Sequence, residues 1–180
     1  AMQELTPYLN PAWGDGPDSL FSRVARAAVM ATHRECDNRV CRMVSFVYGS
    51  GRPALWSHAN LNEDTHDWLR GEFGKVPMSF FAQMAACVKA GELVSVSSRP
   101  GLMPRYASEA PRTDARFALL AGAQNRCFLP ESQQRTYDFL SRHRSGDTLH
   151  VLPNYGHLDV FFGKDAAHDV FPIILGELNR

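Results

Sequence analysis

The stretch Val151 to Gly163, VLPNYGHLDVFFG, decides the fold of this chain. It begins with an apolar run that is typical of a buried strand, and it then turns at Tyr155-Gly156. His157 follows the turn directly, and the residues from there to Phe162 are apolar apart from Asp159. A lone histidine here is either a turn or packing residue or a general base, since an imidazole exchanges protons near neutral pH.

The elements around this stretch alternate between strand and helix. The sequence predicts strands over Arg116–Ala121 and Thr148–Leu152, an amphipathic helix over Pro130–His143 between them, and a final helix over Lys164–Leu178. Crossovers of this kind favour parallel strand pairing with right-handed connections. The last third of the chain is therefore expected to be of the α/β class.

The first two thirds of the chain are mostly helical in pattern. Apolar residues at helical spacing, with capping residues or glycines at the ends, predict three helices: 20–32, 62–74 and 77–91. The short apolar run 42–48 fits either a helix or a strand, and 93–97 is predicted to be a short strand.

Composition excludes several classes of function. The chain has 19 Lys+Arg and 19 Asp+Glu residues, so its net charge is zero and no basic stripe points to a nucleic-acid partner. Its apolar runs are far too short for a transmembrane segment. The proline- and glycine-rich lead-in over 1–17 does not resemble a signal peptide. Localisation stays open, with the cytoplasm slightly favoured and any signal expected upstream.

The four cysteines leave three alternatives open. Cys36 and Cys41 are close enough in sequence for a disulfide in an oxidising compartment, or all the thiols are unpaired, or some bind a metal. A zinc site needs two ligand pairs at metal spacing, but only this one loose pair is visible and the histidines form no H-E-x-x-H pair. The sequence therefore assigns no metal and no cofactor.

A general base of the triad type needs an acid that fixes its tautomer. The natural place is the loop after the preceding parallel strand, which here offers only the amides of Gln124 and Asn125. An amide accepts a hydrogen bond more weakly than a carboxylate does. The nearest carboxylates in the sequence are Glu131, which suits the first turn of its helix, and Asp159.

No nucleophile for such a base is recognisable. The G-x-S-x-G turn of a serine hydrolase is absent from the sequence, and Gly49-Ser50-Gly51 lacks its spacing. Cys127 follows the loop after the first predicted strand and offers a thiol, although a buried packing role suits it better.

Four blocks of sequence together resemble a known family. They are HRECDNRVCRMVSFVYG, SHANLNEDTHDWLRGEFGKVPMSFFAQMAACVKAGELV, AGAQNRCFLPESQQRTYDFL and YGHLDVFFGKDAAHDVFPIILGEL. Their order and content are similar to the C-terminal end of acid-lipase-like α/β-hydrolases. The likeness is greatest to the hydrolase domain fused to, or beside, cholesterol-oxidase-like (GMC) flavin oxidoreductases in bacteria.

The resemblance implies a partial α/β-hydrolase fold, with the last strands and helices of the sheet preceded by a mostly helical cap. Residues 1–97 would form the cap region and 98–180 the C-terminal part of the core. His157 matches the family's catalytic histidine in its Gly-His-apolar-Asp motif, while Asn125 or Gln124 falls where the family places an aspartate. The family's nucleophile and oxyanion hole belong to an N-terminal half that this sequence does not contain, and the flavin-binding glycines are absent as well.

Three hypotheses for function follow. In the first, the chain is the C-terminal portion of an ester or lipid hydrolase, with His157 as base and Asn125 or Asp159 supporting it. The serine would come from an N-terminal half or a second chain, and an apolar ester or lipid-like molecule would bind against cap residues: Phe73, Phe80, Phe81 and Met84. In the second, the chain is a non-catalytic, degenerate hydrolase module that packs on a partner such as a GMC oxidoreductase domain. In the third, Cys127 is the nucleophile of a thiol-dependent enzyme.

Overall fold

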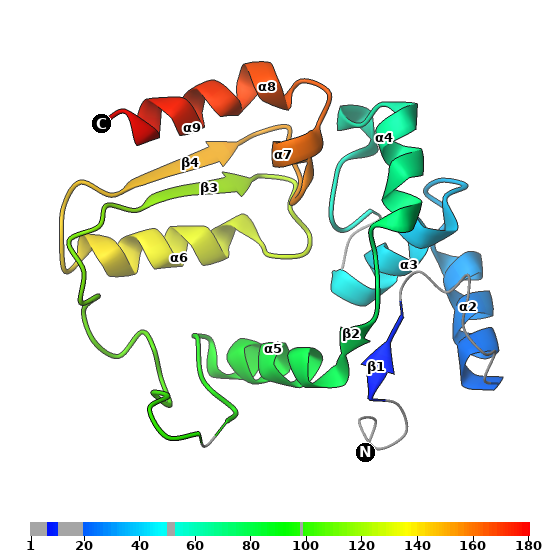
Figure 1. The fold of residues 1–180 in the computed structure, drawn as a ribbon, viewed down its shortest axis with the longest axis horizontal. Helices are drawn as coiled ribbons and strands as arrows, with labels where there is room; N and C mark the ends of the chain where they lie inside the picture. Colours follow the sequence, from blue (N-terminus) through cyan, green and yellow to red (C-terminus); the bar gives the residue numbers. More distant parts are fainter. Residues whose placement is uncertain (1–6, 11–19, 50–52, 98) are drawn as a thin grey trace.

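The computed structural model describes residues 7–10, 20–49, 53–97 and 99–180, and the chain combines helices with two small sheets (Figure 1). Most of the lead-in expected over 1–17 lies outside the described residues. In the described ranges no helix has the length and apolar character that a membrane crossing requires. The elements, in chain order, are β1 (Tyr8–Leu9), α2 (Leu20–Thr32), α3 (Arg39–Tyr48), η1 (His58–Asn60), α4 (Glu63–Trp68), η2 (Leu69–Gly71), β2 (Val76–Pro77), α5 (Met78–Ala90), β3 (Ala118–Gly122), α6 (Pro130–Ser141), β4 (Thr148–Leu152), α7 (Asp159–Phe162), α8 (Ala166–Asp169) and α9 (Phe171–Leu178).

The C-terminal part is a parallel two-stranded sheet between helices. β3 and β4 pair in register from Ala118 opposite Thr148 to Gly122 opposite Leu152, which confirms the predicted parallel pairing. Helix α6 lies along one side of this sheet, and α8 and α9 lie along the other (Figure 1). The apolar core between the sheet and the C-terminal helices consists of Leu152, Tyr155, Val160, Ala166 and Val170, with Leu120, Ile173 and Ile174 packed against it.

The N-terminal part is mainly helical. The predicted helix over 20–32 is confirmed as α2, and the run that fitted helix or strand belongs to α3. Asn38 caps α3 by accepting hydrogen bonds from the backbone N–H groups of Val40 and Cys41, which explains why the helix begins there. Helix α5 ends at Gly91, whose φ of 70° is left-handed and favours glycine. The core of this part consists of Cys41, Val44, Leu55, Trp56 and Leu69.

Three predicted elements differ from the structure. The helix predicted over 62–74 is shorter, because α4 ends at Trp68 and is followed only by the 3-10 helix η2. The prediction of a strand over 93–97 is wrong, because in the described residues this stretch forms only an isolated bridge between Val94 and Arg105. The final helix predicted over Lys164–Leu178 is interrupted after Asp169, and α9 begins anew at Phe171. Pro172 explains the interruption, since proline has no N–H to donate within a helix but is tolerated in a first turn.

The segment 54–60 of the N-terminal part is bound to the C-terminal part. Backbone N–H groups of the loops after β3 and β4, and that of Lys164 after α7, donate to its carbonyl oxygens, and so hydrogen bonds join the two parts at several points. The bonds are Arg126 N to Ala54 O (3.3 Å), His157 N and Leu158 N to Leu55 O (3.1 and 2.8 Å), and Lys164 N to Asn60 O (2.7 Å). Residues on both sides of the boundary expected at 97 and 98 therefore contribute to the surroundings of His157.

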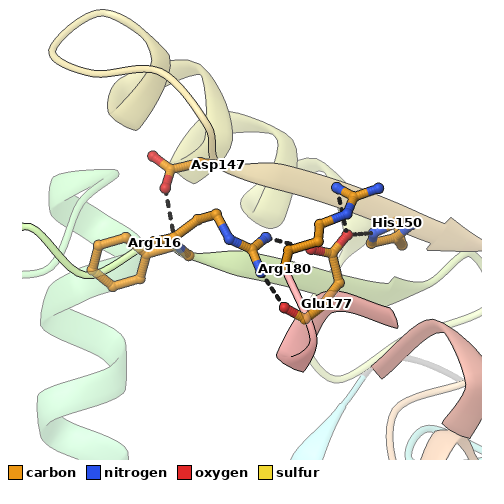
Figure 2. A network of polar contacts seen from close by, with 6 residues as sticks. Arg116, Asp147, His150, Glu177 and Arg180 are labelled. Atoms are coloured by element: carbon orange, nitrogen blue, oxygen red, sulfur yellow. Dashed lines mark hydrogen bonds and ion pairs between the residues drawn. The ribbon is translucent and has the colours of Figure 1, made fainter. Parts of the chain in front are cut away.

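Helix α9 is fixed to the sheet by ionic contacts centred on Glu177, which is buried (Figure 2). Its carboxylate accepts from His150 Nε2 on β4 at 2.7 Å and from the Arg116 guanidinium, and Arg180 lies 3.4 Å away. Arg116 also donates to the Glu177 carbonyl oxygen. The hydrogen bonds from His150 and Arg116 lower the pKa of Glu177 from 4.5 to about 2.

We expect this network to make the chain sensitive to acid. Because the pKa of Glu177 is lowered on folding, its ionised carboxylate contributes fully to the free energy of unfolding above pH 4.5. This contribution is lost as the pH falls towards 2. Urea unfolding of the wild type between pH 5 and about 2 should show a loss of stability that is smaller in Glu177→Gln. The control is Glu131→Gln, an exposed glutamate on α6. If the free energy of unfolding falls equally steeply with pH in the wild type and in Glu177→Gln, the prediction is contradicted.

Candidate functional site

His157 and Asn125 meet where the two parallel strands end. Asn125 lies in the loop after β3, His157 lies in the loop after β4, and Asn125 Nδ2 is 3.1 Å from His157 Nδ1. The loops approach closely because Gly122 has no side chain: a Cβ atom there would lie 1.9 Å from the carbonyl oxygen of Gly156. The structure thus brings together the two residues that the sequence placed at neighbouring strand ends.

The orientation of the Asn125 amide is set by its own hydrogen bonds. The side chain is buried, and its Oδ1 accepts from the backbone N–H groups of Cys127 and Phe128 at 3.0 and 2.9 Å. The Nδ2 group therefore faces His157 and donates to Nδ1. An imidazole that accepts at Nδ1 carries its proton on Nε2, so this bonding pattern assigns the Nε2–H tautomer to neutral His157.

The surroundings of His157 favour its neutral form. The ring is partly buried, and Phe128 meets it edge-on with the ring centroids 5.2 Å apart. Burial lowers the pKa of His157 below its ordinary value of 6.5, although the negative charge of Asp159 acts in the opposite direction. In the resting state Nε2–H is a hydrogen-bond donor. Proton abstraction through Nε2 requires the other tautomer.

The carboxylate of Asp159, expected as a possible support for His157, makes its hydrogen bonds to groups other than the His157 imidazole. It is fully buried, and its oxygens accept from the backbone N–H groups of Gly156 (2.9 and 3.0 Å) and Ser57 (3.2 Å) and from Asn60 Nδ2 (2.6 Å). These bonds join the turn before His157 to the segment that contains η1. Gln124, the other amide of the strand loop, has an exposed side chain, and its backbone N–H donates to the Tyr155 carbonyl oxygen at 2.9 Å.

The aromatic residues expected to line an acyl pocket pack mainly on other aromatic rings of the helical part. Phe73 lies against the N-terminal core, with its ring 5.9 Å from Trp56 and 6.4 Å from Tyr48. Phe81 meets Tyr48 at 6.1 Å and Phe80 at 5.3 Å. Met84 is partly buried on the same helix, α5. The apolar pocket near α5, of about 690 Å³, is lined instead by residues such as Cys87, Leu93, Phe117, Leu119 and Phe139.

Cys127 lies next to the candidate site but is poorly suited to nucleophilic attack. It is partly buried against the N-terminal core. Burial raises the pKa of its thiol to about 11, which disfavours the thiolate that a cysteine nucleophile requires at neutral pH. The four cysteines are free thiols, which fits both the unpaired and the metal-binding alternatives, and no Cys36–Cys41 disulfide is formed in the structure.

A second cluster of reactive side chains lies in the helical part, and the sequence analysis missed it. The Cys/His cluster consists of Cys36, Cys41, His58 and His66, whose ligand-type atoms all lie within 4.8 Å of one another. Cys36 precedes α3, Cys41 is in its first turn, His58 begins η1 and His66 lies on α4. The hydrogen bond from Cys41 lowers the pKa of Cys36 to about 4, and the same bond raises that of Cys41.

Comparison of the chain with models of protein families, with curated proteins and with solved structures gives no match. The class of the chain therefore rests on its own geometry: a helical part joined to a parallel β–α–β unit with a histidine and an asparagine at the strand ends.

Proposed function

We propose that the chain is the C-terminal portion of an ester or lipid hydrolase of the α/β-hydrolase type, in which His157 is the general base. The observation that carries the proposal is the 3.1 Å contact between Asn125 and His157 at the carboxyl ends of neighbouring parallel strands. The two N–H groups on Asn125 Oδ1 hold that side chain as they would hold the carboxylate of a triad.

In the proposed reaction a serine supplied by another segment or chain attacks the ester carbonyl. His157 Nε2 takes the hydroxyl proton and gives it to the departing alcohol, and the acyl-enzyme is then hydrolysed by water with the same histidine as base. His157 must first move its proton from Nε2 to Nδ1, where it meets the Asn125 amide. Rotation of the amide would turn its carbonyl towards Nδ1–H. It would also turn the N–H₂ group towards the N–H groups of Cys127 and Phe128, so that donors face donors and two hydrogen bonds are lost.

The test is His157→Ala in the chain together with the segment or chain that supplies the serine. Hydrolysis of p-nitrophenyl butyrate should fall by at least about 10³-fold, and labelling of the serine by a fluorophosphonate probe should slow in parallel. The control is His168→Ala, an exposed histidine on α8. Activity retained in His157→Ala would refute the proposal, and a label on a serine of this chain would place the nucleophile within it.

Three observations favour a second function, a non-catalytic hydrolase-like module that binds a partner. The Asn125 amide donates to His157 Nδ1, which fixes the tautomer opposite to the one that a base needs. In addition, β3 pairs only with β4 among the described strands, and the 690 Å³ apolar pocket opens between α5, β3 and α6. A partner such as a GMC oxidoreductase domain would cover this surface. Binding of a hydrophobic dye by the isolated chain, lost on addition of the partner, supports the module.

A further inference from the structure

We propose that the chain binds one zinc ion through four side chains of its helical part: Cys36, Cys41, His58 and His66. The proposal rests on the geometry of these residues and stands independently of the hydrolase function. Their ligand-type atoms lie within 4.8 Å of one another although the residues come from α3, η1, α4 and the loop before α3.

The donor set is one that zinc prefers. Two cysteine thiolates and two imidazoles complete a tetrahedral zinc coordination, with Zn–S bonds of about 2.3 Å and Zn–N bonds of about 2.0–2.1 Å. In a tetrahedron of these dimensions the ligand atoms lie about 3.3–3.8 Å apart. Cys41 Sγ and His58 Nε2 are already 3.3 Å apart, so the Cys/His cluster needs to contract by only about 1 Å elsewhere.

A second observation points to a ligand. His66 Nε2 is buried and has no hydrogen-bond partner in the described part of the chain. A buried imidazole nitrogen without a partner is costly, and a bound metal ion would satisfy it. The His58 and His66 rings stand nearly perpendicular, with their centroids 4.9 Å apart, and so they do not stack face to face.

The backbone around the cluster is fixed by Asn38. Its Oδ1 accepts from the N–H groups of Val40 and Cys41, and its Nδ2 donates to the His66 carbonyl oxygen at 2.6 Å. One buried side chain thus holds the start of α3 against α4 and sets the positions of ligands from both elements.

Four protein ligands leave no open coordination position, so the zinc has a structural role. It joins the start of α3 to η1 and α4. Because Asn60 of η1 donates to Asp159, the site also stabilises the segment that supports the His157 turn.

The experiment measures metal binding by the reduced, metal-free chain. Addition of Zn²⁺ should saturate at one ion per chain and protect Cys36, but not the equally part-buried Cys87, from iodoacetamide, as read by peptide mass mapping. Co²⁺ in place of Zn²⁺ should give the intense visible bands of a tetrahedral site and a thiolate charge-transfer band. Absence of stoichiometric binding, or a weak octahedral cobalt spectrum, would overturn the proposal.

Variants locate the site. Cys41→Ser and His66→Ala should each weaken zinc binding by at least about 100-fold. Loss of a residue that only hydrogen-bonds to a metal ligand lowers metal affinity by up to about 100-fold, and loss of a ligand should cost no less. The matched control is Cys87→Ser, a partly buried thiol on α5 outside the Cys/His cluster, which should bind zinc like the wild type. If the ligand variants fail to fold, the cobalt spectrum of the wild type decides. Wild-type affinity in both folded ligand variants would refute the site.

Discussion

Replacement of Asp159 by alanine is expected to lower the free energy of unfolding by about 3–5 kcal/mol. Its fully buried carboxylate accepts hydrogen bonds from Gly156, Ser57 and Asn60. Alanine would leave these three donors without their acceptor, and each buried donor left unpaired costs about 1–3 kcal/mol, less where water reaches it. The loss is large because this one side chain joins the turn of the C-terminal part to the segment 57–60.

Urea unfolding monitored by circular dichroism measures the effect of this change. Asp159→Asn keeps one acceptor oxygen and should lose less stability than the alanine variant. Asp165→Ala removes an exposed carboxylate that makes no capping bond to α8, and it should stay within about 0.5 kcal/mol of the wild type. Amide exchange of Ser57 and Gly156 should speed up only in the Asp159 variants. A loss below about 1 kcal/mol in Asp159→Ala would contradict the prediction.

Local patterns were sufficient to predict most of the helices and both parallel strands. The predicted helix over 20–32 matches α2, and β4 has the predicted bounds, Thr148–Leu152. The predictions that failed did so for two different reasons, a missing strand partner and a helix-breaking proline. The stretch 93–97 has strand-forming residues, but among the described residues its pairing with 104–106 is limited to one isolated bridge, and a strand needs a continuous partner. Pro172 starts a new helix instead of continuing the preceding one.

The candidate hydrolase site was predictable in part for a topological reason. Parallel strands bring their carboxyl ends to one edge of a sheet, so residues just after β3 and β4 had to lie near each other. The direction of the Asn125 amide was not predictable, because it depends on backbone N–H groups of its own loop. Two hydrogen-bond partners of the Asp159 carboxylate, Ser57 and Asn60, lie about a hundred residues away in the chain, so no local sequence pattern predicts them.

The Cys/His cluster shows why spacing rules missed a potential metal site. Cys36 and Cys41 form one loose pair, but His58 and His66 lie in different elements, η1 and α4, and their spacing in sequence matches no helical ligand pair. The packing of α3 against the segment 58–66 brings the two pairs together, with Asn38 as the bridge. The sequence feature that most of these ligands share is a nearby asparagine cap: Cys36 and Cys41 flank Asn38, the N-cap of α3, and His66 follows Asn62, the N-cap of α4.

Asn125→Asp is expected to reverse the tautomer of His157 and to raise its pKa. A carboxylate in the place of the amide would keep the two backbone N–H bonds and accept a third from Nδ1–H, which moves the lone pair to Nε2. In the wild type the lowered pKa of His157 means that its neutral form prevails in the fold above pH 6.5. In the variant the opposite charge should raise the pKa by about 1–3 units above that of the wild type.

Ring ¹⁵N chemical shifts followed through a pH titration report both changes. The wild type should titrate below pH 6.5 with its proton on Nε2, and Asn125→Asp should titrate at a higher pH with its proton on Nδ1. The control is Gln124→Glu, which adds a carboxylate one residue away on an exposed side chain and should leave the tautomer unchanged. An Nδ1–H tautomer in the wild type would contradict the assignment from the Asn125 hydrogen bonds.

The same variant separates the two proposed functions. In serine-protease triads the reverse exchange, acid to amide, lowers kcat by about 10⁴ because the histidine is held in the wrong tautomer. If the chain is the base-bearing portion of a hydrolase, Asn125→Asp in the presence of the serine-bearing segment should raise p-nitrophenyl butyrate hydrolysis by at least about 10-fold. If the chain is a non-catalytic module, the tautomer will change and hydrolysis will not. A lower rate in a variant whose ring proton has moved to Nδ1 would mean that Nε2–H itself is required, and His157 would then act as a hydrogen-bond donor and not as a base.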